Sequence, residues 1–257
     1  MVLSVHPRIS VDEECAGPLP FMEEIDFWKE LGVSNVGMIS PKLEAIGWDT
    51  KLVASSGLRA SNVCCEWGAL PEALEFGAAM DSDLVWLAIT GSIGSRLWEE
   101  AADDFCERIA PIVARAAELG VRFAIQPTNS LRLDYSFIFT LRDTLEVARR
   151  AGTDVVLELE CCWYERGLKK LVRENIDRIA LVQISDFRIG STTTPDRSVI
   201  GEGDIPLERL LDLILEAGYE GMFDLELVGP KIAAEGYLSA TRRSLERATD
   251  MLERLGA

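Results

Sequence analysis

Carboxylate side chains recur near the ends of short apolar runs in the second half of the chain. Glu158 and Glu160 alternate with leucines in one run, and Asp224 and Glu226 alternate with leucines in another. Successive side chains of a strand point to opposite faces, so the acidic residues of each run share the face opposite to the leucines. Buried carboxyl groups are unfavourable unless they are paired, protonated, hydrogen-bonded or metal-bound. We interpret them as a catalytic cluster; the alternative is a structural rim held by salt bridges.

Amide side chains occupy similar places in two further runs. Gln126 lies near the end of run 122–127, and Gln183 lies in run 181–186, which ends with Asp186. A neutral amide exchanges no proton, but it donates hydrogen bonds to a developing oxyanion. We therefore expect Gln126 and Gln183 to bind substrate. We expect Asp186 to orient Gln183, Arg188 or a substrate hydroxyl group.

The order of elements around these residues indicates the fold. Strand-like runs alternate with helical patterns, and they lie near residues 2–9, 34–39, 59–65, 83–90, 121–127, 153–160, 179–186 and 221–228. Eight strands with alternating helices in about 250 residues are typical of an α/β fold of the (β/α)8 TIM-barrel type, whose functional groups lie at the carboxyl ends of the strands. A doubly wound open sheet is the main alternative. No Gly-x-Gly-x-x-Gly follows the first run, so no nucleotide cofactor is expected. We expect residues 1–257 to form a single domain.

The longest segment without a helix or strand pattern covers residues 188–204, after the seventh run. Loops of this length are uncommon unless they are functional or disordered. Arg188 and Arg197 lie in this segment, where a guanidinium group can bind a carboxylate or phosphate of the substrate. Surface charge is the alternative interpretation for both arginines.

The overall composition limits the kind of partner. The chain has 26 Lys and Arg against 43 Asp and Glu, a formal net charge of −17, which disfavours nucleic acid and anionic membranes. No apolar run is long enough to span a membrane, and no signal peptide is recognisable. Six cysteines without a Cys-x-x-Cys pattern are typical of a cytoplasmic protein with reduced thiols. A small-molecule substrate is the expected partner.

Several segments together resemble the xylose isomerase-like TIM barrels, the sugar phosphate isomerase/epimerase superfamily. The most specific are residues 201–206, Gly-Glu-Gly-Asp-Ile-Pro, and residues 217–226, where Ala-Gly-Tyr-Glu-Gly precedes Asp-Leu-Glu. Weaker matches lie at residues 120–127, 154–163 and 181–186. The resemblance covers nearly the whole chain. It implies the barrel fold, a homo-oligomer (a dimer or tetramer), and one divalent cation bound on strands five to eight.

Carried over residue by residue, the resemblance assigns the cation ligands to Gln126, Glu158, Gln183 and Glu226. Substrate-binding histidines of the family correspond to Cys161 and, in some members, to Asn129. Every imidazole of the family pattern is therefore replaced. Two carboxylates and two amides form a weak oxygen shell, so we expect either no cation or one weakly bound Mg²⁺ or Mn²⁺.

These departures also bear on the mechanism. Family members often use glutamates on strands five and eight to remove and return a proton, and Gln126 cannot do so. With Glu226 and either Glu158 or Glu160 as catalytic groups, we expect an isomerase, an epimerase or a lyase. It would abstract a proton next to a carbonyl of a small oxygenated substrate, with a weakened or lost metal site. One alternative is a metal-dependent sugar or keto-sugar isomerase or epimerase that keeps the Gln/Glu/Gln/Glu shell. Another is a non-catalytic binding or partner subunit.

Three further residues are expected near the substrate from their places in the chain. His6, the single histidine, lies in the first run, where it binds a substrate oxygen or is a core histidine. Glu66 follows the third run. Trp163 follows the sixth run, where its ring would give the pocket an apolar wall.

Overall fold

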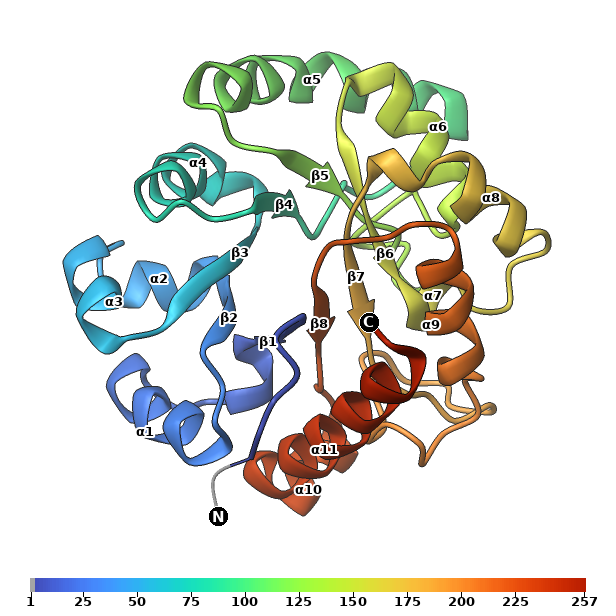
Figure 1. The fold of residues 1–257 in the computed structure, drawn as a ribbon. Coiled ribbons are helices and arrows are strands. Elements are labelled where there is room, and N and C mark those ends of the chain that lie inside the picture. Colours follow the sequence, from blue (N-terminus) through green and yellow to red (C-terminus); the bar gives the residue numbers. More distant parts are fainter. Residues whose placement is uncertain (1–2) are drawn as a thin grey trace.

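The computed structural model describes residues 3–257. Within this range, eight parallel strands close into a barrel in their sequence order, and helices surround them (Figure 1). The strands are β1 (Ile9–Asp12), β2 (Asn35–Ile39), β3 (Arg59–Cys65), β4 (Leu84–Leu87), β5 (Phe123–Ile125), β6 (Asp154–Glu158), β7 (Ile179–Ile184) and β8 (Phe223–Leu225). The (β/α)8 barrel expected from the alternation of elements is therefore confirmed.

The helices mostly follow the periodic segments of the sequence. They are α1 (Phe21–Leu31), α2 (Ser40–Ala45), α3 (Thr50–Ser56), α4 (Leu70–Ala79), α5 (Trp98–Leu119), α6 (Leu141–Ala151), α7 (Leu159–Cys162), α8 (Leu168–Glu174), α9 (Leu207–Glu216), α10 (Pro230–Glu235) and α11 (Tyr237–Leu255). Three short 3₁₀ turns add η1 (Glu13–Ala16), η2 (Trp67–Ala69) and η3 (Ile176–Arg178). Helix α1 ends at Gly32, whose φ of 74° is the left-handed conformation that favours glycine.

The first strand lies further along the chain than the run at 2–9 predicts. Residue 2 lies outside the described residues, and β1 covers Ile9–Asp12. Pro7 interrupts the predicted run, because proline has no N–H to donate to a neighbouring strand. In β1, Ile9 and Val11 join the large apolar core. Their alternation with Ser10 and Asp12 turns these two polar side chains into the barrel.

A polar network closes the interior of the barrel. The Asp224 carboxylate accepts hydrogen bonds from Ser10, from Asn62 at 3.3 Å and from Gln183 at 3.4 Å. Asn62 in turn accepts a hydrogen bond from the Trp86 ring nitrogen at 2.8 Å. Burial raises the pKa of Asp224 to about 6, although these hydrogen bonds oppose the shift. Asp224 therefore belongs to the floor of the barrel.

All six cysteines are free thiols. No helix within residues 3–257 combines the length and the apolar composition needed to cross a membrane.

Candidate functional site

A cavity of about 250 Å³ opens at the carboxyl ends of the strands. This is the end of a TIM barrel at which active sites are found. Its polar and charged lining consists of Asp12, Glu14, Ser40, Glu66, Gln126, Thr128, Asn129, Arg132, Glu158, Glu160, Thr194, Arg197 and Glu226. Apolar surface comes from side chains such as Ile39, Pro41, Trp86 and Val228. We refer to this cavity as the pocket.

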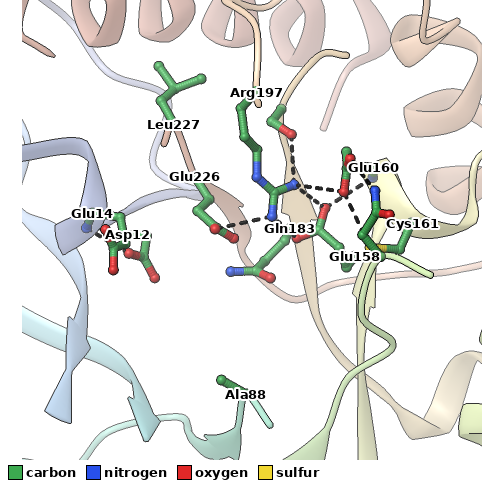
Figure 2. A network of polar contacts seen from close by, with 12 residues as sticks. Asp12, Glu14, Ala88, Glu158, Glu160, Cys161, Gln183, Arg197, Glu226 and Leu227 are labelled. Atoms are coloured by element: carbon green, nitrogen blue, oxygen red, sulfur yellow. Dashed lines mark hydrogen bonds and ion pairs between the residues drawn. The ribbon is translucent and has the colours of Figure 1, made fainter. Parts of the chain in front are cut away.

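The guanidinium group of Arg197 joins the acidic residues of the pocket (Figure 2). Its Nη1 and Nη2 atoms donate to the two oxygens of Glu158 at 2.9 and 3.0 Å. Nη2 also donates to Glu226 at 3.1 Å, and Nη1 donates to Ser185 at 3.1 Å. Glu160 lies 3.7 Å from Nη1. Salt bridges thus hold these carboxylates together. The predicted catalytic cluster therefore also has the salt bridges that the alternative interpretation, a structural rim, requires.

The carboxylate of Glu226 accepts fewer hydrogen bonds than that of Glu158. Both oxygens of Glu158 accept from Arg197, and one also accepts from the backbone N–H of Glu160 at 3.0 Å. One oxygen of Glu226 accepts from Arg197, and its side chain keeps 14% of its surface exposed. Burial raises the pKa of Glu226 to about 8, and the Arg197 charge opposes this shift. Glu226 can therefore exchange a proton with a ligand near neutral pH.

Asp186 fixes the loop that supplies Arg197. Its carboxylate accepts backbone N–H bonds of 2.8 to 3.1 Å from Phe187, Gly201, Gly203 and Ile205. Asp186 also pairs with Ser198 through an isolated antiparallel bridge. These side-chain hydrogen bonds of Asp186 go to the backbone and not to the expected Gln183 or Arg188, and Asp186 does not line the pocket. Asp186 instead determines where Arg197 lies.

The expected cation ligands do not fit a divalent cation in this arrangement. Glu158 and Glu226 contact the Arg197 guanidinium, which supplies the positive charge between them. Gln183 turns toward Asp224, and Gln126 donates to the Ala88 carbonyl at 3.5 Å. Within residues 3–257, no group of three or more His, Cys, Asp or Glu side chains is arranged to bind a metal ion.

The pocket brings together most of the residues expected from the sequence: Glu66, Gln126, Asn129, Glu158, Glu160, Cys161, Arg197 and Glu226. Glu160 reaches it from α7, because the chain turns into a helix at Leu159 where a strand was expected to continue. Asn129 donates to one Glu160 oxygen at 3.0 Å. The Cys161 thiol donates to the other at 3.3 Å, and burial raises the pKa of this thiol well above its usual range. Cys161 is therefore a neutral wall residue.

Besides Asp186, four expected residues lie outside the pocket. His6 precedes β1 at the opposite end of the barrel, where its Nε2 lies 3.1 Å from the Ala257 carbonyl oxygen, so the predicted substrate contact is wrong. Arg188 is exposed and does not line the pocket. The turn into α7 directs Trp163 against Tyr164, edge to face at 5.7 Å, and away from the pocket. Gln183 is fully buried beneath the pocket, so it cannot contact a ligand there.

Sequence reasoning missed two acidic residues of the pocket, Asp12 and Glu14. They were missed because the first strand was expected at residues 2–9, whereas β1 covers Ile9–Asp12. The alternation Ile-Ser-Val-Asp in residues 9–12 is the same signal as the alternation around Glu158 and Glu226. Applied to residues 9–12, it would have identified Asp12.

Known proteins share this chain's sequence pattern and fold. Residues 69–255 match the family described as xylose isomerase-like TIM barrel. A region of 118 residues is 27% identical to the inosose isomerase of Halalkalibacterium halodurans and covers 43% of this chain but only 40% of that protein. A solved structure of IolI protein with a bound zinc atom superimposes with a TM-score of 0.80 at 14% identity, over 96% of this chain and 99% of that chain. The 3-keto-D-glucoside 4-epimerase from E. coli superimposes with a TM-score of 0.72 at 17% identity, over 93% and 99%.

At such identities, the two solved structures establish the fold alone. The family match shows membership of a family as well as the fold, because it covers more than half of the chain and includes β5 to β8. The chain belongs to the xylose isomerase-like TIM barrel family.

Proposed function

We propose that this chain is an isomerase or epimerase that moves a proton next to the carbonyl group of a small polyhydroxylated ketone. Two names among its relatives support this class, inosose isomerase and 3-keto-D-glucoside 4-epimerase. A pocket with acidic groups and amides at the carboxyl ends of the strands is consistent with it. An isomerisation or epimerisation of this kind needs a group that removes a proton from carbon.

The position of Glu226 supports the proposal most directly. Its carboxylate lies in the pocket beside the Arg197 guanidinium, and its pKa is raised to about 8. A general base acts best when its pKa lies near the working pH. In the proposed reaction, the ionised Glu226 takes the proton from the carbon next to the carbonyl.

Arg197 balances the charge during this step. Before the reaction, Nη2 of Arg197 donates to Glu226. Its positive charge favours the ionised form of Glu226, which this step requires. Glu158 keeps Arg197 in place through its two hydrogen bonds. We therefore assign Glu158 to positioning. We assign Glu160, Asn129 and Gln126 to binding of substrate hydroxyl groups.

The charges of the pocket favour an uncharged substrate. Six carboxyl groups line it, from Asp12, Glu14, Glu66, Glu158, Glu160 and Glu226. The cationic side chains among the described lining residues are Arg132 and Arg197. Arg132 pairs with both oxygens of Asp134 at 3.0 and 2.9 Å, and Arg197 is paired as described above. A phosphate group would meet carboxylates without a free cation, so we expect a neutral keto-sugar or cyclitol ketone.

Proton exchange into heavy water tests the proposal. With inosose and a 3-keto-D-glucoside as probes, we expect the protein to exchange the hydrogen next to the carbonyl for deuterium, followed by NMR. Glu226→Gln should slow the exchange by at least about 100-fold. Glu146→Gln is the matched control, because Glu146 is exposed on α6. Exchange that is equally fast in Glu226→Gln would contradict the role of Glu226.

Two further arms of this experiment address the cation and the substrate charge. Dialysis against EDTA should leave the exchange rate unchanged, because the carboxylates that would bind a cation contact Arg197. A rate that falls with EDTA and recovers with Mn²⁺ would support the metal-dependent alternative. A phosphate ester of the same ketone should react more slowly than the neutral ketone.

We also propose that the chain forms a homo-oligomer, a dimer or a tetramer. Exposed large apolar side chains lie in the segments that follow β4 to β7, namely Leu97, Leu131, Leu133, Tyr135, Tyr164 and Ile189. Burial of these side chains against another copy would remove apolar surface from water. Light scattering that gives the mass of one chain, 28.4 kDa, would contradict this assembly.

A further inference from the structure

Asp12 is the immediate neighbour of Glu226 in the barrel. Strands β1 and β8 pair in parallel with Val11 opposite Leu225, so the next residues along each strand are Asp12 and Glu226. Both side chains line the pocket, and Asp12 is only 2% exposed. Figure 2 shows Asp12 on the side of Glu226 that faces away from Arg197.

The two neighbouring carboxyl groups differ in their partners. Glu226 contacts the Arg197 guanidinium at 3.1 Å. Asp12 accepts a hydrogen bond from the backbone N–H of Glu14 at 2.8 Å and, within residues 3–257, contacts no Lys, Arg or His side chain. The titratable groups that face Asp12 are themselves acidic. They are Asp224 on β8, Glu226 directly after β8, Glu14 and Cys15 in η1, and Cys64 on β3. Burial and these charges raise the pKa of Asp12 well above its usual range.

Adjacent acids with unequal surroundings divide the roles of acid and base between them. The charge of Arg197 favours the ionised form of Glu226. Asp12 is more buried and has no cation partner among the described residues, which favours its protonated form. The pair therefore presents a base and an acid side by side to one ligand.

The proposed reaction also requires an electrophile at the carbonyl oxygen. Arg197 cannot readily fill this role, because its Nη1 and Nη2 hydrogens are directed to Glu158, Ser185 and Glu226. Gln126 can donate a hydrogen bond but cannot transfer a proton. Asp12 is a buried carboxyl group that lies beside the base, on the neighbouring strand of the barrel.

We propose that Asp12 is a catalytic acid, which donates its proton to the carbonyl oxygen of the substrate while Glu226 removes the proton from the adjacent carbon. This inference rests on the proposed function.

The proton balance of an α-hydroxy ketone isomerisation is complete with these two residues. Glu226 takes the carbon-bound proton, the electrons of that C–H bond form the C=C bond, and the carbonyl π electrons bind the proton from Asp12. The product of this half-reaction is a neutral enediol. In the second half, the Asp12 carboxylate takes the proton of the neighbouring hydroxyl group, and that oxygen becomes the new carbonyl. Glu226 returns its proton to the carbon of the former carbonyl, so both residues regain their starting forms.

Asp12→Asn tests the assignment while keeping the side-chain oxygen that caps η1. With inosose and a 3-keto-D-glucoside as probes, we expect kcat to fall by at least about 100-fold. We also expect the loss of the alkaline limb of the pH profile, which a purely structural role would leave in place. Asp212→Asn is the matched control, because Asp212 is exposed on α9. Thermal unfolding of each variant verifies that it is folded.

A spectroscopic measurement tests the same point without a substrate. At pH 7, the infrared spectrum of the protein should contain protonated-carboxyl absorption that Asp12→Asn weakens and Asp212→Asn leaves unchanged. A kcat equal to that of the unsubstituted protein, or an unchanged carboxyl band, would overturn the assignment of Asp12. If the unsubstituted protein exchanges no hydrogen of either probe, the proposed function itself fails. If exchange is present and unaffected by Asp12→Asn, only the role of Asp12 is wrong.

Discussion

Arg197 forms ion pairs with three carboxylates of the pocket, those of Glu158, Glu160 and Glu226. Its side chain is 10% exposed, and its partner Glu158 is 2% exposed. Burial of the Arg197 guanidinium disfavours its charged form, but the charges of its carboxylate partners outweigh this effect. The pKa of Arg197 is therefore raised well above its usual range. A buried pair of this kind stabilises little by comparison with apolar packing, but removal of one partner leaves uncompensated charge.

Substitution Arg197→Ala should therefore destabilise the protein markedly. We expect the free energy of unfolding to fall by about 3–5 kcal/mol, since Glu158 and Glu226 lose their cation in a buried site. Urea unfolding measures the difference. Arg188→Ala is the control from the same loop, because Arg188 is exposed, and it should change stability by less than about 0.5 kcal/mol. Equal effects of the two substitutions would show that the network contributes nothing.

The ionisation of Glu226 predicts the acidic limb of the pH–rate profile. A general base must be unprotonated, and burial raises the pKa of Glu226 to about 8. We expect kcat/KM to rise with pH through about 8, and to fall only at the higher pH at which Asp12 loses its proton. Steady-state rates from pH 6 to 10 with the probe ketones provide the measurement. A profile that is already flat at pH 6 would show that a group with an ordinary carboxyl pKa is the base.

At the scale of elements, the loop between β7 and α9 completes the site. The strands place Glu158 and Glu226 at the rim, but the loop brings Arg197 to them. Asp186 organises this loop through four backbone N–H groups. Gly203 allows the close approach, since a Cβ atom there would lie only 2.2 Å from an Asp186 oxygen. The Gly-Glu-Gly-Asp motif is thus explained by the packing of backbone around a buried carboxylate.

Asp186→Ala should release the loop and displace Arg197. We expect faster amide hydrogen exchange across residues 187–205, lower activity, and a loss of about 1–3 kcal/mol in unfolding free energy from the unsatisfied buried N–H groups. The control is Asp204→Ala, because Asp204 accepts from the single backbone N–H of Ile189 at an exposed site. Exchange rates in the loop that match those of the control would contradict the role of Asp186.

At the scale of the whole molecule, buried acids determine how stability varies with pH. Burial raises the pKa values of Asp12, Glu13, Glu24, Asp224 and Glu226 in the folded protein. Above their ordinary pKa values, the folded state then binds more protons than the unfolded state. Stability must decrease as pH rises through this range. The net charge of −17 acts in the same direction, through repulsion within the compact chain.

We therefore expect the protein to be most stable near pH 5. The unfolding free energy should fall by several kcal/mol between pH 5 and pH 8, since one pKa unit corresponds to about 1.4 kcal/mol. Below about pH 4 it should fall again, as the paired carboxylates with lowered pKa values, such as Asp196 and Glu235, take up protons. Chemical denaturation at a series of pH values checks the curve. Glu226→Gln should flatten the decline near pH 8, and a stability maximum at pH 8 or above would contradict the account.

The sequence alone determined the barrel and much of its acidic rim. Helices α1 and α5 each end directly before a glycine, Gly32 and Gly120, in the left-handed conformation, which is a signal carried by the local sequence. Glu158 and Glu226 were placed at the pocket because alternation along a strand is a local property. This periodicity depends only on residues that are close together in the sequence, so it can be recognised without knowledge of distant contacts.

Only the tertiary structure decided which groups act together. Asp12 and Glu226 become neighbours because the barrel closes between its first and last strands. Arg197 reaches Glu158 and Glu226 from a loop whose path depends on the buried Asp186. Loops have no repeating pattern, and closure depends on contacts between residues more than 200 positions apart, such as Ser10 with Asp224. The ion pairs and the neighbouring acids that define this site arise from those long-range contacts.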